Sequence, residues 1–218
     1  DTLDDKKIKY YFQYTLNNYD KEGLEPNVPR LKDRITTFKE LSVKIGKKKT
    51  IWRFDPLILS DQLTIDILID RISKIGEELK DYTKKLVISF ADIDVYKKVQ
   101  NNLKKKTDNY REFTEKEVKE FSRKLVELNN KLGLKITTCA EQYDLKEFEI
   151  EKNRCIDDEL MVQEFGSDSE LMTFIGHDPQ MPLFDEKGDY QHNVRLKDKG
   201  QRKECGCIMS KDIGMYNA

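Results

Sequence analysis

The chain contains four cysteines, and folding alone gives little reason for their positions. Cys205 and Cys207 flank a single glycine in the polar stretch ECGCIMSKDIG, Cys139 follows an apolar segment, and Cys155 lies in the loop sequence NRCIDDE. A thiolate metal site often joins a close cysteine pair to ligands from separate loops. The spacing therefore allows one metal site with four cysteine ligands. Two buried and two incidental exposed thiols explain the same spacing equally well.

Composition limits the other uses of these thiols. The amino-terminal sequence DTLDDKKIKY is charged and carries no secretory signal, and 218 residues is far above the size of disulfide-stapled mini-proteins. We therefore predict reduced thiols or metal ligands and a cytoplasmic location. A net charge of −1 removes the simplest argument for nucleic-acid binding. The apolar runs are shorter than the roughly 20 residues of a membrane helix, so we predict no membrane partner.

A second group of polar residues stands at the ends of strand-like segments. Arg53 and Asp55 alternate with two aromatic residues, which places both on one face of their strand, and Glu141 follows a later strand. A guanidinium can hold a carboxylate or phosphate, and a carboxylate can act as acid or base. Loop polarity, helix capping and simple ion pairing explain the same residues without a site. We predict Arg53, Asp55 and Glu141 as catalytic residues. The substrate-binding residues predicted beside them are Gln13, Thr15, Ser89 and Asp92.

Strand-like and helix-like segments alternate along the chain and must position these groups. Strands are predicted at about 9–16, 50–56, 85–91 and 134–140, and helices at about 30–46, 64–79, 114–133 and 157–165. Repeated βα units predict a parallel sheet covered by helices, in either a doubly wound sheet or a β/α barrel. In both folds the active site lies at the carboxyl ends of the strands.

The chain contains no Gly-x-Gly-x-x-Gly motif and no phosphate-binding loop motif. This argues against an open sheet of the nucleotide-binding type. We predict an α/β fold, a partial TIM-type β/α barrel, with an irregular carboxyl-terminal segment. The predicted domains are a barrel-like domain at residues 1–165 and a loop-rich segment at residues 166–218 that carries the Cys-Gly-Cys motif.

Several stretches together resemble one known family. They are YYFQYTLNNYDKEGLEPNVP, IWRFDPLILSD, VISFADIDVYKK, TTCAEQYDL, NRCIDDEL and CGCIMSKDIGMYN. In this order they resemble a bacterial family catalogued as domain of unknown function 1848, over nearly the whole chain. The resemblance implies further sequence at both ends, with early barrel strands before the chain and three more cysteines after it. Those three are similar to the cluster-binding loop of radical S-adenosylmethionine enzymes such as spore photoproduct lyase.

Two functions are consistent with these observations. The resemblance implies an enzyme of radical S-adenosylmethionine type with an unknown small-molecule or nucleic-acid substrate. Its cofactors would be an iron–sulfur cluster held by Cys139, Cys155, Cys205 and Cys207, and S-adenosylmethionine in the full-length protein. The alternative is a non-catalytic zinc-binding module, with lysine runs at 47–49 and 104–106 as the support for nucleic-acid association. Metal analysis separates the two.

Overall fold

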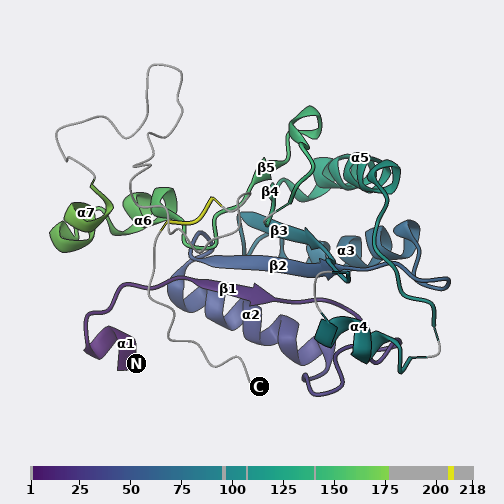
Figure 1. Cartoon of the computed structure of the whole chain (residues 1–218). Coiled ribbons are helices and arrows are strands. Elements are labelled where there is room, and N and C mark those ends of the chain that lie inside the picture. Colours follow the sequence, from purple (N-terminus) through teal and green to yellow (C-terminus); the bar gives the residue numbers. More distant parts are fainter. Residues whose placement is uncertain (1, 95–96, 107, 140, 177–205, 209–218) are drawn as a thin grey trace. The chain divides into compact units, whose positions relative to one another are not determined.

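The computed structural model describes residues 2–94, 97–106, 108–139, 141–176 and 206–208. A five-stranded parallel sheet forms its centre, with the strands in sequential order (Figure 1). The strands are β1 (Phe12–Thr15), β2 (Thr50–Leu57), β3 (Lys85–Phe90), β4 (Lys135–Thr138) and β5 (Glu151–Lys152). The predicted parallel βα arrangement is confirmed. Within the described residues the sheet is open, with β1 and β5 at its edges, so a closed TIM-type barrel is not confirmed.

Three long helices connect the strands. They are α2 (Leu31–Ile45), α3 (Ile65–Leu79) and α5 (Glu115–Leu132), and the shorter α4 (Lys97–Leu103) precedes α5. Threonine side chains cap the starts of two of the three, α3 and α5. Thr114 and Glu117 form a capping box at the start of α5, in which each side chain accepts the backbone N–H of the other residue. Gly133 ends that helix in the left-handed region, at φ 64°, which glycine adopts without steric cost.

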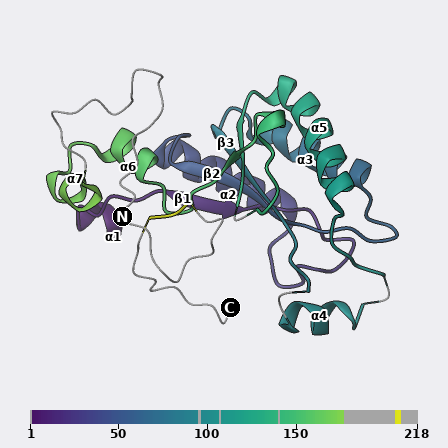
Figure 2. The same ribbon diagram turned by 45° about the horizontal axis from the view of Figure 1, so that its top comes forward.

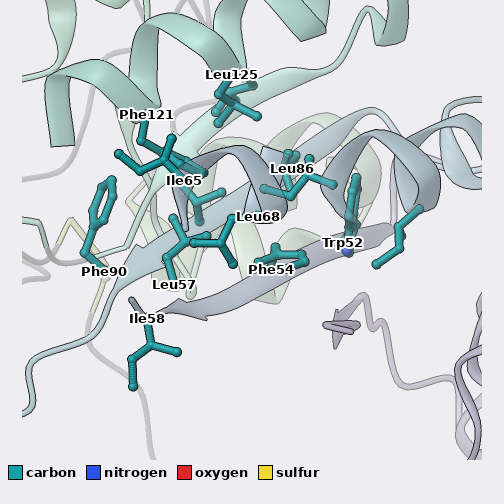
Figure 3. Close-up of a cluster of buried hydrophobic side chains, with 14 of the residues drawn as sticks. Trp52, Phe54, Leu57, Ile58, Ile65, Leu68, Leu86, Phe90, Phe121 and Leu125 are labelled. Atoms are coloured by element: carbon teal, nitrogen blue, oxygen red, sulfur yellow. The ribbon is translucent and has the colours of Figure 1, made fainter. Parts of the chain in front are cut away.

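The three long helices pack on one face of the sheet. In β2 the alternation of side chains sends the fully buried Trp52 and Phe54 into the core that these helices share. Figures 1 and 2 show α3 and α5 side by side, and Figure 3 shows Leu68 of α3 and Phe121 of α5 among the strand residues. Burial of each such side chain contributes about 1.5–3 kcal/mol, so this core dominates the stability of the sheet.

The chain divides into two units, Tyr10–Lys152 and a second made of Asp1–Lys9 with Asn153–Ala218. We call the first the sheet unit and the second the cysteine unit. The sequence prediction instead placed a boundary after residue 165. The sheet unit also contains the 3-10 turn Lys146–Phe148.

The described part of the cysteine unit contains three helices, α1 (Thr2–Asp5), α6 (Asp158–Phe165) and α7 (Ser169–Ile175). The prediction of loop beyond Gly166 is wrong for α7, which Asp168 caps by accepting a hydrogen bond from the Leu171 N–H at 3.0 Å. No helix in the described ranges is both long and apolar enough to cross a membrane.

Candidate functional site

Arg53, Asp55 and Gln13 form one hydrogen-bonded group on the sheet. Arg53 Nη1 donates to Gln13 Oε1 at 2.7 Å, its Nε donates to Asp55 Oδ2 at 3.1 Å, and its Nη2 pairs with the same oxygen. The Arg53 and Asp55 side chains are 14% and 24% exposed. Because strand side chains alternate, this group lies on the face opposite Trp52 and Phe54. Two neighbouring strands therefore present a guanidinium with a fixed carboxylate beside it.

Asn17 fixes the backbone on which Asp55 stands. Its side-chain amide donates to the Asp55 carbonyl at 2.9 Å, and its side-chain oxygen accepts the Asp55 N–H at 2.9 Å. The amide thus continues the pairing of β1 with β2 beyond the end of β1. Arg34, which is also buried, donates to the Asn17 carbonyl at 3.0 Å. Sequence reasoning did not single out Asn17, although an asparagine directly after a strand is a typical turn residue.

Glu141 is a buried carboxyl group after β4, with 7% of its surface exposed. Its Oε1 accepts the N–H groups of Gln142 at 2.8 Å and Tyr143 at 3.3 Å. Burial raises the pKa of Glu141 and the charge of Asp92 adds to the rise, although the two N–H groups oppose it. Glu141 therefore keeps its proton to a higher pH than an ordinary carboxyl group, as a general acid must.

The other predicted residues lie on or just after the same strands. Thr15 is the register partner of Arg53, and Ser89 follows Ile88, the partner of Phe54. Asp92 acts on Glu141 through its charge. The structure thus joins Gln13, Arg53 and Asp55 by hydrogen bonds and couples Glu141 to Asp92 electrostatically. A single pocket for all of them stays a prediction.

Cys207 and Cys155 meet in the cysteine unit, although 52 positions separate them in sequence. The Cys207 sulfur accepts the backbone N–H of Cys155 at 2.9 Å and that of Ile156 at 3.3 Å. The Ile208 N–H donates to the Ile156 carbonyl at 3.3 Å, and Asn153 Nδ2 donates to the Cys155 sulfur at 3.6 Å. Backbone N–H groups that point at cysteine sulfur are a common second shell of thiolate metal centres and tune their potentials.

Gly206 has a packing role in this arrangement. A Cβ atom at this position would lie 2.9 Å from Cγ of Arg154 and 3.5 Å from the Asn153 carbonyl oxygen. Arg154 has little room to move, because it donates to Asp158 at 2.9 Å and to Glu159 at 2.7 Å. Burial alone would lower the pKa of Arg154, but these acids outweigh burial and raise it, so the side chain stays charged. The glycine between the two cysteines lets the chain lie close against this loop.

The remaining predicted ligands are not placed with this pair. Cys139 directly follows β4 in the sheet unit, where its N–H donates to the Ile88 carbonyl at 2.9 Å, and Cys205 lies outside the described residues. The described residues contain no group of three or more histidine, cysteine, aspartate or glutamate side chains arranged to hold a metal ion. Of the four predicted ligands, Cys155 and Cys207 thus lie in one hydrogen-bonded arrangement, and the four-ligand site stays a prediction.

Comparison with known protein families identifies the chain. The model of the family described as Domain of unknown function (DUF1848) matches residues 1–218. The chain belongs to the DUF1848 family. No curated protein and no solved structure matches it. Within this DUF1848 chain, the Arg53 group and the Cys155–Cys207 pair are therefore interpreted from their own geometry.

Proposed function

We propose that this DUF1848 protein binds a metal ion or an iron–sulfur cluster through cysteine thiolates. The observation that carries the proposal is the Cys207 sulfur, which accepts N–H groups from both Cys155 and Ile156. Backbone N–H groups directed at a cysteine sulfur are typical of the second shell of thiolate metal centres, and this likeness supports the proposal. Cys205, two positions before Cys207, and Cys139 are the proposed further ligands.

The proposed scaffold is part of a TIM-type barrel. Sequential strand order, parallel pairing and long helices on one face support it, because a doubly wound sheet reverses its strand order and carries helices on both faces. On this scaffold the Arg53 group would bind a carboxylate or phosphate of the substrate, and Glu141 would hold a proton near it. A cluster, when bound, supplies electron transfer. A radical S-adenosylmethionine reaction remains the expectation that the family resemblance implies.

A structural zinc site is the second candidate, and the small core of the cysteine unit favours it. Its described hydrophobic cluster has four buried members, Val162, Met172, Ile175 and Ile208. Units with so little apolar burial commonly depend on a metal or disulfides. Binding free energy at a thiolate site would then be folding free energy for this unit.

Metal analysis of the full-length protein, purified without oxygen, tests the proposal. We expect stoichiometric metal in the wild-type protein and its loss in Cys155→Ser and in Cys207→Ser. Iron with acid-labile sulfide and visible absorbance supports a cluster, and zinc alone supports the structural site. Cys139→Ser tests whether the ligand set extends to the sheet unit. Circular dichroism of each variant checks that the sheet unit is folded. Wild-type protein without metal, or unchanged metal content in both serine variants, would contradict the proposal.

A further inference from the structure

A polar cleft of about 630 Å³ opens in the sheet unit, separate from the Arg53 group. Its walls come from α3, from the loops after β1 and β2, and from Lys106, Asp108 and Tyr110. The same three residues line a second cleft of about 490 Å³. Each volume falls within the range of small-molecule sites. Most such sites are apolar, so the polar lining of this cleft indicates a polar ligand.

A buried ion pair lines the first cleft. Arg71 pairs with both carboxylate oxygens of Glu22, at 2.9 and 2.7 Å, and also donates to the Asn18 carbonyl. The two side chains are 9% and 13% exposed. These contacts, made within the described part of the chain, use three of the five N–H groups of Arg71.

The charges of the cleft are largely matched within the protein. Burial would raise the pKa of Glu22, but hydrogen bonds from Arg71 lower it, so the pair stays ionised and mutually neutral. Lys74 pairs with Asp70 at 2.6 Å, and Lys106 donates to the Gly23 carbonyl at 2.6 Å. The lining as a whole has four cationic side chains against three carboxylates, which leaves a net charge of +1 and a weak attraction for a phosphate. Donors and acceptors are nevertheless both abundant, which suits hydroxyl groups, since each hydroxyl donates and accepts.

Tyr110 gives the cleft an aromatic surface beside these polar groups. Burial raises its pKa and the charge of Asp108 adds to the rise, so its phenol remains a protonated donor. Asp108 is held in place by the Ser60 hydroxyl and by the Asn109 N–H at 3.1 Å. An aromatic ring flanked by fixed carboxylate and guanidinium groups can stack against the C–H face of a sugar while the polar groups bind its hydroxyls.

We propose that this cleft binds a neutral polyhydroxylated molecule of the sugar class. The near-balance of charge disfavours a strongly charged ligand, the hydrogen-bonding groups fit several hydroxyls, and Tyr110 supplies the stacking surface. The proposal is independent of the thiolate site, because every residue that carries it lies in the sheet unit.

Saturation-transfer NMR of the full-length protein tests this inference. The probes are glucose, galactose, mannose and ribose, with glucose 6-phosphate, inorganic phosphate and adenosine as competitors of other classes. We expect saturable binding of at least one neutral sugar and weaker binding of its phosphate. Tyr110→Ala should weaken binding about tenfold, whereas Tyr110→Phe keeps the ring and should weaken it less.

Tyr82→Ala is the matched control, since Tyr82 is also a partly buried tyrosine packed against the core. It should leave sugar binding unchanged. The inference is overturned if none of the four sugars binds, if phosphate or adenosine binds in preference to them, or if Tyr82→Ala weakens binding as much as Tyr110→Ala. Metal content measured on the same variants should equal that of the wild type, which separates this outcome from that of the thiolate proposal.

Discussion

The sheet unit and the cysteine unit are held together by different means. In the sheet unit, apolar side chains from three strands, β2, β3 and β4, and from three long helices form one buried cluster. In the described part of the cysteine unit, four apolar residues are buried together. Three partly buried apolar residues, Ile156, Met161 and Leu171, pack against them. Polar contacts join them, such as Arg154 with Asp158 and the Cys207 sulfur with two N–H groups. The sheet unit can therefore fold by hydrophobic burial, whereas the cysteine unit gains most from an added ligand.

We expect the largest loss of stability from a substitution in the core of the sheet unit. Phe121 is fully buried and meets Phe90 and Phe113 edge to face, with ring centroids 5.8 Å apart in both pairs. Phe121→Ala leaves a cavity there, and we expect the free energy of unfolding to fall by about 3–5 kcal/mol in urea titrations. Val43→Ala, at a residue 78% exposed, is the control and should change it by less than about 0.5 kcal/mol. If Phe121→Ala lowered the free energy of unfolding only slightly, the assignment of Phe121 to the core would be wrong.

Metal removal should affect the cysteine unit and spare the sheet. After chelation we expect amide hydrogen exchange in residues 153–165 to accelerate at least about tenfold, because a ligand at 100 times its Kd stabilises by about 2.7 kcal/mol. Exchange in β2 and β3 should not change. The measurement is exchange mass spectrometry on the same protein before and after chelation. Equal acceleration in both units would show that the proposed difference between them is wrong.

Acid should weaken the start of α5 through Glu117. Hydrogen bonds from Arg111 and Thr114 lower the pKa of Glu117 to about 2, although burial opposes the shift. A lowered pKa in the folded state stabilises the protein above the unfolded pKa near 4.5, and this stability is lost as the pH falls from about 4.5 to 2. With solvent screening, Glu117→Gln should cost at most about 1 kcal/mol at pH 7. The difference from wild type should vanish near pH 2; if it persists, the ion pair is not its cause.

The sequence predicted the local elements of the sheet unit well, because periodicity and caps are local signals. The helix predicted at about 114–133 matches α5, which follows the cap Thr114 and ends before Gly133. The alternation around Arg53 predicted that it shares a strand face with Asp55, and the two side chains are hydrogen-bonded. The sequence could not predict the β1–β2 link through Asn17 or the Arg71–Glu22 pair, because both depend on contacts between residues far apart in the chain.

The cysteine unit was harder to predict. Helix α7 has seven residues and follows a stretch rich in glycine and aspartate, so its short apolar pattern did not stand out. The meeting of Cys155 with Cys207 had a weak signal in the Cys-Gly-Cys spacing. That Cys207 meets Cys155 depends on a reversal of the chain over 52 positions, which no local sequence pattern specifies.

Two glycine substitutions test with the smallest change whether the sheet unit and the cysteine unit are stabilised by different means. Gly133→Ala forces a side chain into the left-handed region at φ 64°, where nothing crowds it, so the cost is about 1 kcal/mol of sheet stability. Gly206→Ala instead places a methyl group 2.9 Å from Arg154 Cγ. Because two acids hold Arg154, the Cys-Gly-Cys segment must move away, and the Cys207 sulfur then leaves its N–H donors. We expect Gly206→Ala to lower metal content without a measurable change in the urea unfolding of the sheet, and Gly133→Ala to do the reverse. If Gly206→Ala destabilised the sheet as much as Gly133→Ala does, the two units would share one source of stability, and the cysteine pair would be part of the core.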